Sequence, residues 1–340
     1  MEQRTNIVDA VKLFFAVCII AMHTSLLNQF SEPVYWYVMH LLFRLAVPFF
    51  FVASGFFLGK KMLPIADNRE KRIAVCIQYA KKLIPSFLFW STIGLIWYTI
   101  TLIRSRVPHI PLKVIQTAIF YPQGAMWFVS ASIFAVLAIG QLWNYKKLLI
   151  FTSMGGYIFA LICNSYYFLV ADSWMGNVVD SYMRMFLTAR NFLGIGLIYI
   201  GLGVWLSSEK CFVNKQSTKF LVVYTILFYC VLIGEVTFCY GKKVLDDSSC
   251  FVSLPFLAVC FLALSLRIKA NFSEHASKKM RRISADFYYL HPALNNYIGT
   301  IVFSLVGNYI VRFAVVFALC ITFWIITNRS ENKFIRAVLP

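Results

Sequence analysis

The chain alternates between long apolar runs and short polar or basic segments along almost its whole length. A membrane-spanning helix needs roughly 20 consecutive apolar residues, so we marked windows of about that size bounded by charges, proline or glycine. The windows run approximately over residues 7–27, 34–58, 83–103, 126–143, 148–170, 187–206, 220–239, 250–266, 287–306 and 309–327. The pattern predicts an all-α, polytopic integral membrane protein of about ten transmembrane helices.

The composition agrees with this interpretation, because 60% of the residues are hydrophobic and only 14% are charged, whereas soluble domains carry roughly 25% charged residues. The connections between windows are too short for a folded soluble domain, so we expect residues 1–340 to form a single transmembrane domain. The first window carries Asp9 and Lys12 and lacks a clear cleavage site, so we expect it to be retained rather than removed as a signal peptide.

The formal net charge of +18 would suit a nucleic-acid partner, but the basic residues follow the loops instead of gathering in one segment. With the N-terminus in the cytoplasm, 22 of the 32 Lys and Arg residues fall on the cytoplasmic side and 7 on the outer side. The other three, Lys12, Arg44 and Arg312, lie inside windows. This bias predicts cytoplasmic termini, with the lipid bilayer and no nucleic acid as partner.

Two segments outside the windows have amphipathic patterns. Residues 69–82 are basic, which predicts a helix on the anionic cytoplasmic leaflet. Residues 111–121 are too short to span and contain Lys113 and Gln116, which predicts an interfacial or re-entrant helix on the outer side.

Charged side chains inside the hydrocarbon region cost at least a few kcal/mol, so they are candidates for function. Lys12 and His23 are separated by three helical turns and share one face of the first window, about 16 Å apart along the axis. A cation near the cytoplasm can hold an anionic ligand, and a histidine beyond it can accept a proton near neutral pH. The alternative is that Lys12 extends to the interface and His23 is a buried hydrogen-bonding residue.

Arg44 lies far from the ends of the second window, which favours a functional role. His291 precedes Pro292, so it is either an active-site residue or a partner for the carbonyl that the proline leaves without a donor. For His40, His109 and His275 we expect solvated or interfacial positions.

The nine cysteines are scattered singly and no metal-ligand spacing occurs, so we expect no metal site. The motifs of zinc proteases, nucleophile-elbow hydrolases and nucleotide-binding loops are absent.

Four ordered motifs resemble the acyltransferase 3 family of bacterial membrane acyltransferases. They are the Lys-x10-His pattern from Lys12 to His23, RLAVPFFFVASGFFL from Arg44, AMWFVSASIF around Trp127 and ISADFYYLHPAL around His291. The resemblance covers most of the chain and implies ten helices with both ends in the cytoplasm.

The resemblance implies that His23 is the catalytic histidine and that Lys12 and Arg44 belong to the acyl-CoA or active-site channel. Members tend to carry an Arg-x-x-Arg pair before a proline at the third helix, where this chain has Lys81 and Lys82 before Pro85. Lysine keeps the charge but lacks the bidentate guanidinium, so Lys81 and Lys82 are weaker candidates for the CoA phosphates. Arg69 and Arg72 are possible substitutes.

The expected activity is transfer of an acyl group, most simply acetyl, from cytosolic acetyl-CoA to a hydroxyl of an envelope glycan or lipid-linked sugar. His23 acts either as general base or as a transient acyl carrier, and Lys12 or Arg44 offsets the developing oxyanion. The alternative function is a transporter or flippase for a small or lipid-linked anionic substrate, with Lys12, Arg44 and Arg312 along its path.

Overall fold

The computed structural model describes residues 6–123, 125–244, 249–268, 272–328 and 330–339. Helices make up 81% of the chain and no strand occurs in the described ranges, so the predicted all-α class is confirmed. Arg4, Lys269 and Arg329, which enter the count of loop charges, lie outside the described residues.

The chain divides into two compact units, each assembled from segments that are distant in the sequence. Unit 1 consists of Met1–Ala46, Pro85–Ile110 and Ser265–Pro340, and unit 2 of Val47–Ile84 and Pro111–Leu264. A single helix, α4 (Arg69–Arg104), contributes its first half to unit 2 and its second half to unit 1. The expected single domain over residues 1–340 stays a prediction.

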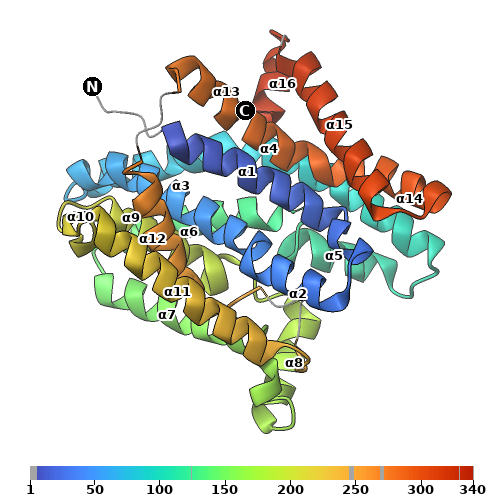
Figure 1. Ribbon diagram of the computed structural model, residues 1–340, viewed down its shortest axis with the longest axis horizontal. Coiled ribbons are helices and arrows are strands. Elements are labelled where there is room, and N and C mark those ends of the chain that lie inside the picture. Colours follow the sequence, from blue (N-terminus) through green and yellow to red (C-terminus); the bar gives the residue numbers. More distant parts are fainter. Residues whose placement is uncertain (1–5, 124, 245–248, 269–271, 329, 340) are drawn as a thin grey trace. The chain divides into compact units, whose positions relative to one another are not determined.

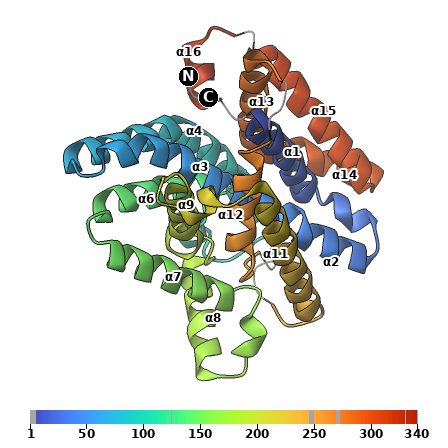
Figure 2. The same ribbon diagram turned by 60° about the vertical axis from the view of Figure 1, so that its left-hand side comes forward.

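Unit 1 is built around α1 and α13, which lie side by side in both ribbon views, with α15 packed on α13 (Figures 1 and 2). The buried side chains of α1 include Val8, Phe15, Ile19 and Ile20, whose spacing places them on one side of a helix. Besides the second half of α4, its helices are α1 (Asn6–His23), η1 (Leu26–Gln29), α2 (Glu32–Leu41), η2 (Phe43–Leu45), α13 (Glu274–Leu294), η6 (Asn295–Gly299), α14 (Thr300–Val306), α15 (Tyr309–Asn328) and α16 (Lys333–Val338).

Unit 2 holds the middle of the chain, and its core lies among α6, α7, α9 and the π-helix η5. Besides the first half of α4, its helices are α3 (Ala46–Met62), η3 (Leu63–Ile65), α5 (Ile110–Phe120), α6 (Trp127–Leu142), α7 (Lys146–Ile162), η4 (Tyr167–Leu169), α8 (Trp174–Phe186), η5 (Phe192–Gly196), α9 (Leu197–Leu206), α10 (Phe212–Lys215), α11 (Thr218–Cys239) and α12 (Leu254–Ser265).

Prolines alter two of the predicted windows. The second window is not one regular helix, because the 3-10 turn η2 separates α2 from α3. Pro48 lacks the N–H that would bond the Arg44 carbonyl, so the regular helix is interrupted one turn before it. The ninth window begins within α13, which contains Pro292, and continues through the π-helix η6 into α14.

The basic segment 69–82 is not the separate interfacial helix that the sequence predicted. It forms the first half of α4, which continues without interruption through the third window to Arg104. The outer segment 111–121 does form a short helix, α5. The helix α8 was not among the predicted segments, because polar residues recur every few positions along it and no long apolar run results.

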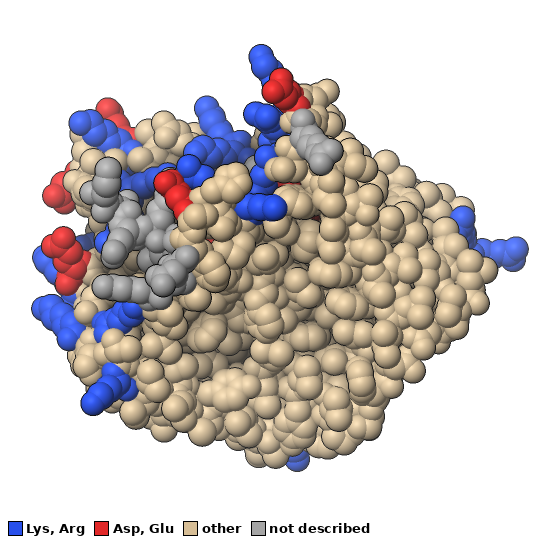
Figure 3. Space-filling model, turned by 45° about the horizontal axis from the view of Figure 1, so that its top comes forward, with Lys and Arg blue, Asp and Glu red and all other residues tan. Residues whose placement is uncertain are grey.

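Within the ranges that the structure describes, four helical segments are long and apolar enough to cross a membrane, namely Glu32–Ile65, Arg69–Arg104, Thr218–Cys239 and Tyr309–Asn328. Other apolar helices are shorter, such as α6 and α12. Large apolar side chains are exposed, with Phe151 77% and Leu305 80% accessible, and the face in Figure 3 includes wide uncharged areas. These features identify a membrane protein, while the number of about ten spans and the cytoplasmic termini stay predictions.

Glycines in α3 and α9 allow these two helices of unit 2 to touch. A Cβ atom on Gly203 would lie 2.1 Å from the Val52 carbonyl oxygen, and one on Gly55 would lie 2.2 Å from the Ile200 carbonyl oxygen. Small residues permit such close backbone approach between membrane helices.

We therefore expect Gly203→Ala to destabilise the protein by about 1–3 kcal/mol, because the added methyl group forces α9 away from α3. Gly201→Ala is the matched control, because Gly201 lies on the same helix and a Cβ atom there would meet nothing within 4 Å. Thermal unfolding of both variants in detergent checks this, and equal melting temperatures would contradict the close contact.

Candidate active site

The α1–α13 contact carries hydrogen bonds along its whole length. Three side chains of α13 and η6 donate to α1: Ser277 Oγ to Asp9 Oδ2 at 2.6 Å, Ser284 Oγ to the Lys12 carbonyl at 3.1 Å, and Asn295 Nδ2 to the His23 carbonyl at 2.9 Å. Residue numbers rise together along both elements, so α1 and α13 run parallel. This direction agrees with the prediction that both belong to odd-numbered windows.

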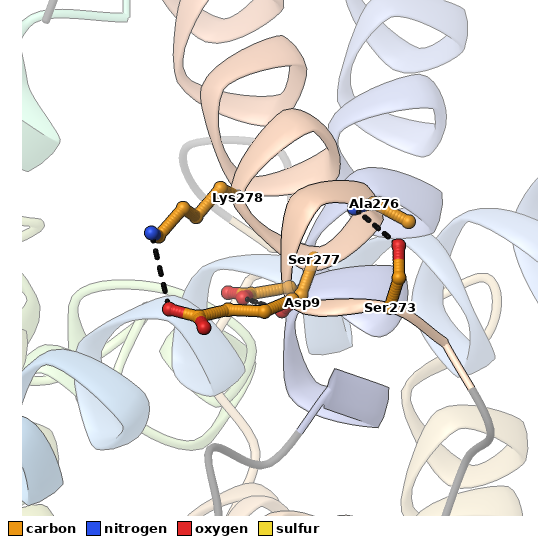
Figure 4. A network of polar contacts seen from close by, with 6 residues as sticks. Asp9, Ser273, Ala276, Ser277 and Lys278 are labelled. Atoms are coloured by element: carbon orange, nitrogen blue, oxygen red, sulfur yellow. Dashed lines mark hydrogen bonds and ion pairs between the residues drawn. The ribbon is translucent and has the colours of Figure 1, made fainter.

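The first turns of α13 fix its starting point beside α1 (Figure 4). Ser273 caps the helix by accepting a hydrogen bond from the Ala276 N–H at 3.1 Å. The Asp9 carboxylate accepts from Ser277 in the same turn. The nearby ion pair between Lys278 and Glu274 is 3.0 Å long, but both side chains are more than half exposed, so it contributes little to stability.

The ring of His291 lies beside the ring of His23, with centroids 5.0 Å apart. His291 is fully buried, whereas His23 is half-buried. The Nδ1 atom of His291 lies 2.9 Å from the Phe287 carbonyl and donates to it in the neutral tautomer. Its Nε2 atom then presents a lone pair, and no hydrogen-bond partner for it occurs among the described residues. His291 thus bonds a carbonyl of its own helix and also faces His23.

Asn295 connects His23 to α15. Its Nδ2 donates to the His23 carbonyl, and its Oδ1 accepts from Arg312 Nε at 3.0 Å. A Cβ atom on Gly299 would lie 2.8 Å from Asn295 Oδ1, so only glycine leaves room for this contact. Asn295 was not among the predicted site residues. Its position four residues after His291, which places both on one side of the helix, is the sequence signal that points to it.

Arg44 lies in the turn η2 and is buried. Its Nη1 donates to the Met22 sulfur at 3.5 Å, next to His23 in the sequence. Unit 1 therefore brings the Arg44 side chain to the same end of α1 as His23. The sequence placed Arg44 inside a continuous helix, and the structure corrects this to a 3-10 turn.

Lys12 is half-buried near the opposite end of α1, and its electrostatic neighbours include Asp9 and Arg281. Arg281 lies between Ser277 and Ser284 on α13, one turn from each, which places it on the side that faces α1. The eleven residues from Lys12 to His23 correspond to roughly 16 Å of helix. A ligand that reaches both residues must therefore be extended.

The four basic candidates on α4 differ from one another. Lys81, Lys82 and Arg69 are exposed. Arg72 is fully buried and donates to the Gly140 carbonyl at 3.0 Å and to the Ala66 carbonyl. Because its guanidinium is committed to backbone groups of unit 2, Arg72 is a poor substitute for a phosphate-binding arginine.

Trp127 begins α6 in unit 2 and is buried. The guanidinium of Arg190 lies over its ring at 5.3 Å and over the Tyr121 ring at 5.8 Å, and its Nη2 donates to the Tyr121 hydroxyl at 3.0 Å. Arg190 is itself buried, whereas the sequence assigned it to the outer loop charges. Unit 1 brings His23, His291, Arg44 and Lys12 onto or beside α1, and Trp127, Lys81 and Lys82 belong to unit 2.

Two carboxylates near the predicted windows differ in how they are satisfied. Glu235 accepts from the Tyr166 hydroxyl and from the Val252 and Ser253 N–H groups at 2.8 and 2.9 Å, so it holds the segment before α12. Asp286 is fully buried, and neither carboxylate oxygen has a hydrogen-bond donor among the described residues. The described residues contain no group of three His, Cys, Asp or Glu that suits a metal ion.

The fold and the site define a helical membrane protein with a histidine pair, one member fully buried and the other half-buried, and with cationic side chains toward both ends of one helix. The chain belongs to the acyltransferase 3 family, whose sequence profile describes an acyltransferase domain and matches residues 6–329. This match confirms the family resemblance found in the sequence.

The chain is also similar to much longer proteins. It is 22% identical to an amino-acid racemase of Enterococcus faecalis over 86% of this chain and 41% of that protein. It is 25% identical to a serine/alanine racemase of Enterococcus gallinarum over 97% of this chain and 47% of that protein. The chain thus spans less than half the length of these curated relatives. No solved structure matches it.

We expect Asp286→Asn to leave the free energy of unfolding unchanged or to raise it, because a buried carboxylate without donors is costly and the amide is neutral. Asp9→Asn is the matched comparison on α1, where the carboxylate accepts from Ser277, and this change should destabilise. Thermal unfolding of both variants tests the contrast, and a larger loss at Asp286 would show that its charge is satisfied.

Proposed function

We propose that the chain transfers an acyl group, most simply acetyl, from cytosolic acyl-CoA to a hydroxyl of an envelope or exported glycan, with both termini in the cytoplasm. The observation that carries the proposal is the His23–His291 pair, 5.0 Å between ring centroids, in a chain of the acyltransferase 3 family. Acyl transfer to a hydroxyl needs a base for the hydroxyl proton, and a half-buried histidine with a second imidazole beside it meets this need.

In the general-base route, His23 takes the proton of the acceptor hydroxyl while the hydroxyl oxygen attacks the thioester carbonyl carbon. The C–S bond then breaks, and the leaving thiolate takes the proton from His23. His291, with its Nδ1 proton directed at Phe287, presents the Nε2 lone pair as an acceptor that favours protonated His23. Arg44, near Met22, supplies positive charge for the tetrahedral oxyanion.

In the covalent route, a neutral nitrogen of His23 attacks the thioester carbon, the C–S bond breaks, and the leaving CoA thiolate takes the proton of the other ring nitrogen. The acceptor hydroxyl then attacks the acyl-imidazole, the C–N bond breaks, and the hydroxyl proton returns to the imidazole of His23. Rapid quenching and mass spectrometry of the protein distinguish the routes, because only this one attaches the acyl group to the α1 peptide.

The donor fits α1 by its length and charge. Lys12 and Arg281 supply cations for CoA phosphates at one end, and the pantetheine arm spans the roughly 16 Å to His23. Lys81 and Lys82, the other predicted phosphate contacts, are exposed on the part of α4 that belongs to unit 2.

A transporter of a small anionic or zwitterionic substrate is the second candidate. It is favoured by the intramembrane cations Lys12, Arg44 and Arg312 and by relatives named for acting on serine and alanine. Under this alternative, those amino acids are the first cargo to try, and His23 relays protons instead of moving an acyl group.

Membranes that contain the protein should release free CoA from labelled acetyl-CoA in the presence of a cell-envelope extract, and glycans should gain acetyl groups visible by mass. Uptake of labelled serine and alanine into vesicles is measured in parallel. Uptake without acyl transfer or CoA release would overturn the acyltransferase proposal.

His23→Ala should abolish transfer while membrane insertion and melting temperature stay close to the wild type, since the His23 contact with Asn295 uses the backbone carbonyl. His40→Ala is the control for removal of another imidazole from unit 1: His40 is buried, and its Nδ1 lies 2.7 Å from the Trp36 carbonyl, one turn earlier in α2. This burial corrects the solvated or interfacial position expected for His40. Full activity of His23→Ala would make His23 structural.

A further inference from the structure

The backbone at His23 needs an external hydrogen-bond donor. His23 is the last residue of α1, and the final carbonyls of a helix lack partners within it. The donor is Asn295 Nδ2 at 2.9 Å, from the π-helix η6. Asn295, 272 residues after His23 in the sequence, therefore anchors the backbone that carries the histidine ring.

The amide of Asn295 is itself oriented from its other side. Arg312 Nε donates to Asn295 Oδ1 at 3.0 Å, and a guanidinium can only donate, so it fixes the oxygen toward Arg312 and the nitrogen toward His23. The Arg312 guanidinium also lies over the Phe303 ring at 5.8 Å, which restrains it. Gly299 leaves the space for this arrangement.

We propose that Arg312 and Asn295 are positioning residues for the histidine of this acyltransferase: they connect α15 and η6 to the end of α1 and hold the His23 ring against His291. The inference rests on the proposed function of His23. It assigns Arg312, an intramembrane cation, to the support of the catalytic histidine rather than to a transport path.

Different substitutions test the two hydrogen bonds of Asn295, one to His23 and one from Arg312. Asn295→Asp keeps an acceptor for Arg312 but removes the donor to the His23 carbonyl. Arg312→Met removes both the charge and the hydrogen-bond donor, while Arg312→Lys keeps the charge and can donate one hydrogen bond to Asn295. If positioning is the role, the order of activity is wild type, Arg312→Lys, Arg312→Met, with Asn295→Asp as low as Arg312→Met.

We expect kcat for acetyl transfer to fall about 100-fold in Asn295→Asp, as for a misplacement of about 1 Å, while the KM for acetyl-CoA stays unchanged. Asn308→Ala is the matched control. Asn308 accepts from the Ile310 and Val311 N–H groups at 2.9 and 3.1 Å, so this change weakens the start of α15 without touching Asn295. An equal loss of kcat in Asn308→Ala and Asn295→Asp would show that the contact between Asn295 and the His23 carbonyl contributes only to stability, and this result would overturn the proposal.

A second measurement does not depend on acyl transfer. Diethyl pyrocarbonate modifies neutral imidazoles, and mass spectrometry of the α1 peptide gives the rate at His23 as a function of pH. We expect Asn295→Asp to shift this pH profile and speed the modification, and Asn308→Ala to leave both unchanged. An unaltered His23 profile in Asn295→Asp overturns the positioning role.

The two measurements separate the possible failures. If the wild type transfers no acyl group, the proposed function fails, and the modification profile alone decides whether Asn295 and Arg312 hold His23. If the wild type is active and both kcat and the profile are unaffected in Asn295→Asp, the positioning inference fails and the acyltransferase proposal stands.

Discussion

The parallel contact between α1 and α13 is the constraint on which the site depends. Lipid offers no hydrophobic drive for one apolar helix to associate with another, so close packing and interhelical hydrogen bonds keep such a pair in register. Ser277, Ser284 and Asn295 provide these bonds at three levels of α1. A shift by one turn would break all three and separate His23 from His291, so the register of the pair and the geometry of the site are one property.

The buried and half-buried ionisable residues of this protein include two contrasting kinds. Arg72 and Glu235 direct their charge at backbone groups of unit 2, and such residues keep connecting segments attached to helices. His23 and His291 instead direct their rings at each other, and His291 retains a lone pair without a partner among the described residues. Burial alone therefore does not distinguish a candidate catalytic side chain from a structural one. The group that each side chain contacts does, and this group is known only from the fold.

Periodicity and spacing were enough to predict the helical class and to place Lys12 and His23 on one helix, because these features depend on residues close in the sequence. The roles of His23 and His291 in catalysis stay predictions. The turn at Arg44 was not predicted, because the apolar window from residue 34 to 58 is continuous. Only the missing N–H of Pro48, four residues after Arg44, indicates a break there. The contacts of Asn295 with His23 and of Arg281 with Lys12 join segments more than 250 residues apart, which no local pattern encodes. The continuity of α4 was missed because its basic first half resembled a surface helix.

The division of the chain into two units has a mechanical consequence. The backbone passes between the units four times, after Ala46, Ile84, Ile110 and Leu264, and three of these passages lie within two residues of a proline: Pro48, Pro85 and Pro111. Pro48 and Pro111 stand in the first turns of α3 and α5, where an N–H has no partner within the helix, whereas Pro85 removes one hydrogen bond from the middle of α4. Bending α4 at the passage between the units therefore breaks one hydrogen bond fewer than bending it elsewhere.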